Sequence, residues 1–427
     1  MHTNKFAAPR MLTMLTMAML ATSVFTTSVQ VSAQTERVLH SFNSPEDGTQ
    51  PFGNLVFDKA GNLYGTTLFG GAYTNGEVFE LSPNGTGGFT YHVLYSFNPN
   101  IGDGVNPYGA LVFDKAGNLY GTTYAGGGGR YGTVFELSPQ SGGVWTESVV
   151  HSFKSQQGDG RYPLAGLMID GKGNLYGTTS QGGSGATCGS SGCGTVFLLI
   201  PRGGGLWTEK ILHSFDGGTT DGSSPLASLV LHAGKLYGTT QVGPAGGSAN
   251  SGTVFELAPA GSGGWTETIL HTFTNNGTDG YNPRAAVVFD SAGNLYGTTN
   301  NGGANDYGTV FELSPSAGGN WTETNVHDFY SIPGVDGVNP ESAGLTFDAS
   351  GNLYGTTSGG GANANGIVYK LMPATGGGWT ESVVFTFNGT DGNQPVSGVT
   401  LDRKGNIYGS TEFGGANSGG TAFKIVP

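Results

Sequence analysis

Short runs of alternating apolar and polar residues, separated by glycine-rich turns, fill the chain from residue 36 onward. Four such runs make one unit: "LVFD" (Leu55–Asp58), "NLYGTT" (Asn62–Thr67), "EVFELSP" (Glu77–Pro83) and "FTYHVLYSF" (Phe89–Phe97). Their Val, Phe, Tyr, Thr and Leu side chains favour half-buried strands. Since no 3.6-residue period indicates a helix, the pattern predicts four strands per unit, which we name A, B, C and D in chain order.

The unit recurs seven times. Its marker is the tyrosine of an LYGTT-like motif, and the intervals between successive copies run from 54 to 61 residues, at Tyr64, Tyr120, Tyr176, Tyr237, Tyr296, Tyr354 and Tyr408. Tight turns such as "DKAGN" separate A from B, and glycine-rich turns separate C from D. Tandem units of four short strands are typical of propellers. We therefore expect an all-β, seven-bladed β-propeller with four antiparallel strands per blade.

The two ends of the repeat region complement one another. "ERVLHSF" (Glu36–Phe42) reads as a D strand with no A, B or C before it, and "TAFKIVP" (Thr421–Pro427) as a C strand with no D after it. We expect the N-terminal D strand to join the C-terminal A, B and C strands in one blade, which closes the ring and removes an exposed edge.

A constant interval of 15 residues links strand C to strand D, as in Glu136 and His151, Glu256 and His271, and Glu312 and His327. A fixed strand register explains a constant offset. The pairs could be a catalytic base and its orienting carboxylate, but one active site does not need three copies. We therefore expect cross-strand structural contacts.

Residues 1–33 have the features of a secretory signal peptide. Lys5 and Arg10 precede an apolar stretch, Met11 to Phe25, and Val31-Ser32-Ala33 places small residues before Gln34. An uncleaved anchor is the alternative, but the apolar run is shorter than the roughly 20 residues that span a bilayer. The expected domains are a signal peptide at 1–33 and a propeller of units of about 57 residues at 34–427.

Composition and charge narrow the classes of partner. Glycine accounts for 79 of 427 residues without a collagen period, and hydrophobic residues for 36%, so a folded core is expected rather than disorder. The formal net charge of −13 and the absence of a run of basic residues argue against binding of nucleic acid. No later segment resembles a membrane span, and we expect a monomer that is secreted or periplasmic.

Two cysteines, Cys188 and Cys193, lie in "CGSSGC". In an oxidising compartment two thiols this close across glycine and serine favour a local disulfide. A zinc site would need further ligands, which are not nearby, and the spacing is not that of a C-x-x-C redox motif.

The connection from strand D to strand A carries a motif, D-G-x-x-P, in every unit. Its carboxylates could form a ring near the channel mouth and hold Ca²⁺, which prefers oxygen ligands. Alternatively each Asp caps its own turn, Gly adopts a positive φ and Pro fixes the start of strand A. Seven identical copies favour the turn, and apart from this Ca²⁺ alternative we expect no cofactor; the motif begins at Asp47, Asp103, Asp159, Asp221, Asp279, Asp336 and Asp391.

The D–A and B–C connections are expected on one face of the propeller, the face that usually binds ligands. The B–C loops break the sevenfold symmetry, and Tyr, Asn, Asp and Arg side chains suit a glycan or a protein epitope. Solvated loop decoration is the alternative. The candidates for ligand binding are Tyr73, Asn75, Arg130, Tyr131, Arg161, Tyr162, Tyr281, Asp306 and Tyr307, with Tyr108 and Asn282 nearby.

Five tryptophans begin strand D in five units, at Trp145, Trp207, Trp265, Trp321 and Trp379. Stacking on a sugar is conceivable, but packing of the outer strand onto its blade is the simpler expectation. No G-x-S-x-G elbow, H-E-x-x-H helix or P-loop occurs in the sequence, so no catalytic residue is predicted.

In tandem, "GNLYGTT", "GTVFELSP" and "WTE…LHSF" closely resemble the GloVer repeat of the choice-of-anchor tandem repeat GloVer-containing family of exported bacterial proteins. The resemblance spans about residues 36–427 and implies export, with no activity that could be transferred. Because the chain ends at Pro427 without a hydrophobic tail or sorting motif, soluble export is expected rather than anchoring. The "D-x-x-GN-LY" piece also resembles hairpins of NHL and gluconolactonase-type propellers.

Two functions remain open. The first is a non-enzymatic exported propeller that binds a glycan or protein, or has a structural role at the cell surface. The second is a carbohydrate- or lactone-active enzyme with an axial Ca²⁺ site. An enzyme should carry, in one or two blades, acidic or histidine residues near the axis that the other blades lack. The sequence offers three residues without counterparts in other units, Asp306, Glu341 and His232.

Overall fold

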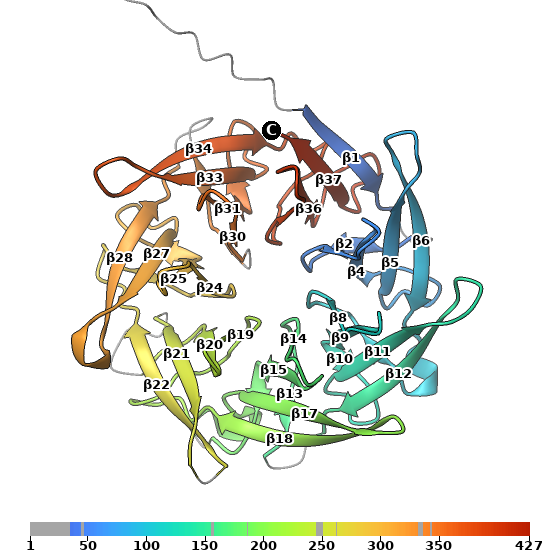
Figure 1. Ribbon diagram of the computed structural model, residues 1–427, viewed down its shortest axis with the longest axis horizontal. Coiled ribbons are helices and arrows are strands. Elements are labelled where there is room, and N and C mark those ends of the chain that lie inside the picture. The colour runs from blue at the N-terminus through green and yellow to red at the C-terminus, as the bar shows by residue number, and fades with distance from the viewer. Residues whose placement is uncertain are drawn as a thin grey trace, which may run out of the picture. The chain divides into compact units, whose positions relative to one another are not determined.

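The computed structural model describes residues 35–427, except 44–46, 155–157, 186, 245–250, 262, 332–335 and 342–343. The expected signal peptide, residues 1–33, lies outside the described residues. Seven antiparallel sheets form a ring around a central axis (Figure 1), and in each sheet the strand order is A, B, C, D from the axis outward. The predicted seven-bladed β-propeller is confirmed.

The two inner strands of each blade differ in length. Strand A is only two or three residues long: β3 (Val56–Phe57), β8 (Val112–Phe113), β14 (Met168–Ile169), β19 (Val230–His232), β24 (Val288–Phe289), β30 (Thr346–Phe347) and β35 (Thr400–Leu401). Strand B contains the LYGTT motif: β4 (Leu63–Phe69), β9 (Leu119–Thr123), β15 (Leu175–Thr179), β20 (Lys235–Thr240), β25 (Leu295–Thr299), β31 (Leu353–Thr357) and β36 (Ile407–Thr411).

The two outer strands form longer hairpins. Strand C is β5 (Glu77–Pro83), β11 (Thr133–Pro139), β17 (Thr195–Gly203), β21 (Thr253–Pro259), β27 (Thr309–Pro315), β33 (Ile367–Pro373) and β37 (Thr421–Val426). Strand D is β6 (Phe89–Ser96), β12 (Trp145–Ser152), β18 (Leu206–Ser214), β22 (Trp265–Thr272), β28 (Trp321–Asp328), β34 (Trp379–Thr386) and, from the start of the described chain, β1 (Thr35–Ser41). We number the blades 1 to 7 from β3, so that blade 7 contains β35, β36, β37 and β1.

Short ribbons connect the blades on one face. The D–A connections contribute β2 (Thr49–Pro51), β7 (Gly104–Val105), β13 (Gly160–Arg161), β23 (Gly280–Tyr281) and β29 (Gly337–Val338). The last four pair with residues that follow strand B, namely β10 (Ala125–Gly126), β16 (Gln181–Gly182), β26 (Asn301–Gly302) and β32 (Gly359–Gly360), whereas β2 pairs with β4 itself. Three 3₁₀ turns complete the described elements: η1 (Pro99–Ile101), η2 (Gly189–Ser191) and η3 (Ala317–Gly319).

The ring closes as the sequence predicts. β1 pairs antiparallel with β37, with Glu36 opposite Ile425 and Val38 opposite Phe423. Phe42, just after β1, is fully buried and packs with Leu55 of blade 1 in the cluster between blades 7 and 1. One blade therefore contains strands from both ends of the described chain.

The hydrophobic core lies mainly between blades. Each of the seven core clusters contains residues of two neighbouring blades. Between blades 1 and 2, for example, Val78 and Phe97 pack with Leu119, Phe135 and their neighbours. Burial of each such side chain contributes about 1.5–3 kcal/mol, so the blades depend on one another for stability.

The tyrosine and the glycine of the LYGTT motif repeat because both make close packing contacts, the tyrosine with the next blade and the glycine within its own blade. In blade 1 the ring of Tyr64 packs edge-on against Phe113 and Trp145 of blade 2, with centroids 5.1 and 6.2 Å apart. A Cβ at Gly65 would lie 2.6 Å from Cζ of Phe79, so only glycine fits beneath that ring. The tryptophan at the start of strand D thus packs across the blade interface, rather than only onto its own blade as expected.

The pairing of strands C and D corrects one expectation. Glu136 lies opposite Ser148, and His151 lies opposite Val134, with a β-bulge that shifts the register by one residue between Val134 and Phe135. The same shift occurs in the other hairpins of this type. The constant offset along the sequence does reflect a fixed register, but the expected pairs Glu136–His151, Glu256–His271 and Glu312–His327 are wrong.

A buried carboxyl group lies at the interface of blades 7 and 1. Glu77 is 0% exposed, and its Oε1 accepts a hydrogen bond from the hydroxyl of Tyr91. The same hydroxyl oxygen lies 2.9 Å from the carbonyl oxygen of Asp47, so its single proton serves either acceptor. The Asp47 carboxylate lies 2.8 Å from Nε2 of His40. Burial raises the pKa of Glu77 to about 7; the hydrogen bond from Tyr91 opposes this rise and the Asp47 carboxylate adds to it.

We predict that ring closure depends on β1. Deleting residues 35–43 removes Phe42 from its core and exposes the edge of β37, so Tm should fall by roughly 10 °C and oligomers should form. Thermal unfolding and size-exclusion chromatography measure both effects. A chain that lacks only residues 1–33 is the control, and a deletion variant that stays monomeric with the parental Tm would contradict this account.

We predict that Glu77 makes stability fall as pH rises. Its pKa in the folded state, about 7, lies above the ordinary value of 4.5, so its contribution is complete below pH 4.5 and is lost as pH rises through 7. Glu77→Gln should flatten the decline of Tm between pH 5 and pH 8 and raise Tm at pH 8. Glu80→Gln, on the other face of β5, controls for loss of a carboxylate, and equal pH slopes in the two variants would contradict the assignment.

Candidate functional site

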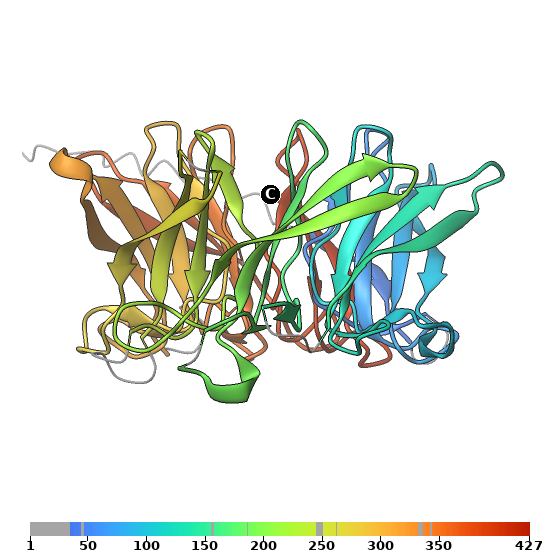
Figure 2. The ribbon, with the colours of Figure 1, turned by 90° about the horizontal axis from the view of Figure 1, so that it is seen from below.

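The D–A connections and B–C loops meet on one face, opposite the A–B and C–D turns (Figure 2). In each blade the residue before the motif proline donates its backbone N–H to the B–C loop of the preceding blade; for example, Tyr162 donates to the carbonyl of Tyr131 at 2.8 Å. Its own carbonyl accepts from the following blade, as from Ser180 at 3.2 Å. The seven donors are Gln50, Asn106, Tyr162, Ser224, Asn282, Asn339 and Gln394.

These donors have a left-handed backbone. Their φ values lie between 55° and 58°, although none is glycine and residues before proline normally avoid this region. The expected positive φ at the motif glycine occurs only at Gly48 and Gly392. Elsewhere the glycine allows close approach: a Cβ at Gly104 would lie 2.2 Å from Oγ1 of Thr123.

Each motif aspartate caps its own connection, as the simpler reading expected. Asp103 accepts backbone N–H groups from Asn98 at 3.1 Å and Gly104 at 2.6 Å. The other six likewise accept a backbone N–H from the start of their connection: Asp47, Asp159, Asp221, Asp279, Asp336 and Asp391. Among the described residues, none of the seven lines the axial pocket.

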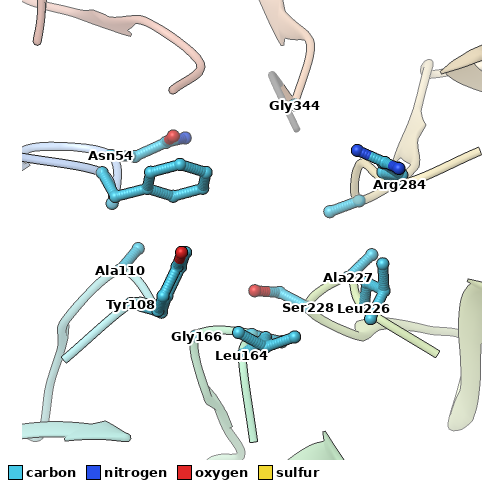
Figure 3. Close-up of a pocket in the computed structure, with 15 residues that line it drawn as sticks. Asn54, Tyr108, Ala110, Leu164, Gly166, Leu226, Ala227, Ser228, Arg284 and Gly344 are labelled. Atoms are coloured by element: carbon cyan, nitrogen blue, oxygen red, sulfur yellow. The ribbon is translucent and has the colours of Figure 1, made fainter. Parts of the chain in front are cut away.

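An axial pocket of about 290 Å³ opens where the D–A connections approach the axis (Figure 3). The residue after the motif proline faces it in most blades, and this position differs around the ring: Phe52, Tyr108, Leu164, Leu226 and Arg284. Asn54 and Ser228 add polar groups to its wall. The sevenfold scaffold therefore surrounds an asymmetric site, aromatic and aliphatic on one side and charged on another.

Arg284, the charged residue of the pocket lining, has an acidic neighbour. Arg284 Nη1 lies 3.6 Å from Glu341 Oε1, and both side chains are about one-third exposed. Burial raises the pKa of Glu412, and the Glu341 carboxylate adds to the rise. Burial also raises the pKa of Tyr108, with Glu412 as the next cause. The pocket can thus hold hydrogen-bonding groups of a ligand beside a fixed cation.

A row of aromatic side chains leads from the pocket toward the rim across blades 1 to 3. Ring centroids are 4.7 Å apart for Phe52 and Tyr108, 6.1 Å for Tyr108 and Tyr124, 4.8 Å for Tyr124 and Tyr162, and 5.5 Å for Tyr162 and Tyr131. The guanidinium of Arg161 lies 5.0 Å from the Tyr131 centroid. We call these residues the aromatic row: Phe52, Tyr108, Tyr124, Tyr162, Tyr131 and Arg161.

The structure brings together three of the candidates from the sequence, Tyr131, Arg161 and Tyr162. Arg130 is exposed beside them, with φ of 69°. Asp306 accepts a hydrogen bond of 2.9 Å from the hydroxyl of Tyr281 in blade 5.

Three further candidates lie away from the row. Tyr307 is 37% exposed beside Asp306 in blade 5. In blade 1, Tyr73 is 46% exposed and its carbonyl accepts a hydrogen bond from the Asn75 side chain. The candidates therefore fall into three separate places on this face.

The expected disulfide between Cys188 and Cys193 is formed, with Cα atoms 5.3 Å apart. It closes the B–C loop of blade 3 around η2. Ser190 of this loop accepts a hydrogen bond of 3.1 Å from Nη1 of Arg161, so the disulfide loop supports the outer end of the aromatic row.

Sequence reasoning missed Phe52, Tyr124 and Arg284. Two positions could have indicated these residues, because they differ between units that are otherwise alike: the residue after the motif proline and the residue after LYGTT. The residues after LYGTT are Leu68, Tyr124, Ser180, Gln241, Asn300, Ser358 and Glu412.

The opposite face also gathers residues that are scattered in the sequence. A second pocket of about 1300 Å³ lies over the A–B and C–D turns of blades 7, 1 and 2. Five basic residues line it, among aspartates and aromatic rings: Lys59, Lys115, Arg403, Lys404 and Lys424. No basic run exists in the sequence because the fold assembles this group from separate repeats.

Two solved structures share the fold. The extracellular domain of a protein assigned as a hybrid two-component system of Bacteroides thetaiotaomicron superposes with a TM-score of 0.53 at 10% identity, over 91% of this chain and 39% of that one. PorZ, a surface component of the type-IX secretion system of Porphyromonas gingivalis, gives 0.51 at 16% identity, over 90% and 47%. This chain thus spans less than half the length of either protein.

No curated protein of known function is detectably similar in sequence. In the part of the chain that the structure describes, no helix has the length and apolarity needed to cross a membrane. The Gloeobacter/Verrucomicrobia repeat model matches residues 16–246 and 242–427, and thus covers the whole propeller. The chain belongs to the Gloeobacter/Verrucomicrobia, or GloVer, repeat family.

Proposed function

We propose that this chain is an exported, non-enzymatic β-propeller that binds a glycan along the aromatic row, with one sugar unit in the axial pocket. The observation that carries the proposal is the asymmetry of the site. Seven nearly equivalent blades support one continuous run of partly exposed rings, confined to blades 1 to 3 and ending at the axis.

The chemistry of the row suits carbohydrate. The C–H faces of pyranose rings pack against aromatic faces, while their hydroxyl groups need hydrogen-bond partners at the edges. The Tyr hydroxyls along the row could serve as these partners, and so could Asn54 and Arg284 in the pocket lining, with Glu341 beside Arg284. A protein ligand would more often require a broader apolar surface with a buried centre.

The location of the fold relatives supports an extracellular role. One relative is an extracellular domain and the other a bacterial surface component. The signal-like residues 1–33 and the disulfide are also in keeping with an oxidising compartment.

We predict that shortening the aromatic row weakens glycan binding. The other repeats supply replacements that their backbones already accept: Tyr108→Leu as at Leu164, Tyr124→Ser as at Ser180, and Tyr162→Asn as at Asn106. Each should reduce affinity about tenfold, because loss of one aromatic contact costs about 1 kcal/mol or more. A glycan array identifies the best oligosaccharide, and calorimetry with that oligosaccharide measures the affinities.

Tyr307→Asn is the matched control, since this tyrosine is exposed on the same face but lies outside the row, and Asn365 occupies the equivalent position in blade 6. Its affinity should equal that of the parent. Absence of glycan binding, or equal losses in the control and the row variants, would contradict the proposal. Hydrolysis of the bound oligosaccharide would instead favour a carbohydrate-active enzyme.

A further inference from the structure

Four blade interfaces place one histidine and two carboxylates near one another, and in three of them the groups are close enough to share an ion. In the fourth, between blades 5 and 6, His327 Nε2 is already hydrogen-bonded to Asp336 Oδ2 at 3.1 Å. The histidine comes from strand D, the aspartate from the D-G-x-x-P motif of the following connection, and the glutamate from the W-T-E segment of the next blade's strand D. The three close clusters are His151–Asp159–Glu209, His213–Asp221–Glu267 and His271–Asp279–Glu323, and within each the potential ligand atoms lie within 4.8 Å of one another.

The spacing within these clusters is that of ligands around a metal ion. His151 Nε2 lies 3.4 Å from Glu209 Oε1 and 3.8 Å from Asp159 Oδ1. Two ligands at the usual Zn²⁺ distances and tetrahedral angle are about 3.4 Å apart. In the interface of blades 7 and 1, by contrast, His40 Nε2 lies 2.8 Å from Asp47 Oδ2, the length of a direct hydrogen bond.

The second cluster is similar, although its histidine is within hydrogen-bond distance of the aspartate. His213 Nε2 lies 3.3 Å from Asp221 Oδ2 and 3.9 Å from Glu267 Oε2. Asp221 is only 7% exposed, yet its Oδ1 has no hydrogen bond among the described residues. A buried carboxylate oxygen without a partner is costly unless a further group satisfies it.

The first and third clusters leave three buried atoms each without a hydrogen bond in the described structure: Nε2 of the histidine, Oδ1 of the aspartate and Oε1 of the glutamate. In the first cluster the other aspartate oxygen, Oδ2 of Asp159, accepts the backbone N–H of Lys154 at 2.8 Å. This contact orients the carboxylate and leaves Oδ1 free toward the cluster, as outer hydrogen bonds do around metal ligands.

The charges of the clusters point the same way. Each cluster places two carboxylates beside a single imidazole. A divalent cation bound between them would offset the repulsion of the two carboxylates.

We propose that each of these three interfaces binds a divalent transition-metal cation of the Zn²⁺ type through one imidazole nitrogen and two carboxylate oxygens. This donor set suits Zn²⁺ or Mn²⁺ better than Ca²⁺, which prefers oxygen ligands alone. Each ion joins two neighbouring blades, so the three together link blades 2 to 5. The sites are distinct from the axial pocket and independent of glycan binding.

The interface of blades 1 and 2 provides an internal control. There Glu147 occupies the same position as Glu209, but Tyr95 replaces the histidine and its hydroxyl donates to Asp103 at 2.7 Å. A phenol that is already hydrogen-bonded to the aspartate leaves no imidazole ligand, so this interface should bind no ion.

The test uses untagged protein stripped with a chelator and titrated with Zn²⁺ by calorimetry, with bound metal measured after gel filtration. The parent should bind three equivalents and its Tm should rise, because the ion binds the folded state. Glu209→Gln, Glu267→Gln and Glu323→Gln should each remove one equivalent, while Glu147→Gln should retain three. Both cysteines form the disulfide, so among the described residues no free thiol competes for Zn²⁺.

The parent protein alone can overturn the proposal: failure to retain Zn²⁺ or Mn²⁺ would do so without any variant. Equal stoichiometry in the three variants and in Glu147→Gln would also overturn it. Three equivalents of Ca²⁺ with no Zn²⁺ bound would contradict the histidine-containing donor set. Thermal unfolding of each metal-free variant verifies that lost binding reflects a lost ligand rather than a lost fold.

Discussion

Packing between blades is the interaction on which the structure depends. Six of the seven blades contribute a tyrosine that packs on the next blade's Phe or Trp, as Tyr64 does on Phe113 and Trp145. Backbone hydrogen bonds from the residue before the motif proline join the same neighbours on one face. Because the interfaces repeat the same contacts, the tyrosine and a threonine of the motif repeat as well. The motif glycine repeats because it lies beneath a phenylalanine ring of its own blade.

Repetition at the interfaces leaves other positions free to vary, and the proposed glycan site uses these positions. In five blades the residue after the motif proline lines the axial pocket, and side chains as different as Tyr108, Leu164 and Arg284 occupy this position. Similarly, Tyr95 replaces histidine in one interface while Asp103 keeps its capping role. The repeated residues thus hold the ring together, and the residues of the proposed glycan site lie where the repeats differ.

Much of the fold was predictable because it follows from local patterns. The segment "EVFELSP" is strand C with the predicted bounds, Glu77–Pro83. The N-terminal D strand, β1, pairs with β37 as expected. The β-bulge beside Phe135 was not predictable, because one extra residue in a strand leaves no mark in a constant interval. The partners of the histidines were assigned wrongly for another reason: a constant interval shows that the register is fixed, but not which residues lie opposite one another.

The candidate site was only partly predictable. Tyr131, Arg161 and Tyr162 stand out as large residues among small ones, whereas Phe52 and Tyr124 look like ordinary strand-flanking aromatics. Their alignment depends on how three blades turn around the axis, which no single repeat encodes. The five basic residues on the opposite face could not be predicted from the sequence for the same reason.

The pairing of β1 with β37 has a consequence for biogenesis. The two strands are separated by nearly the whole described chain, so the sheet of blade 7 is complete only when residues 421–426 have been synthesised and have joined residues 35–41. Contacts between such distant segments form slowly, since the loop between them must first be ordered. A chain that crosses a membrane in an unfolded state would therefore complete its last blade only after its C-terminal strand has arrived on the far side.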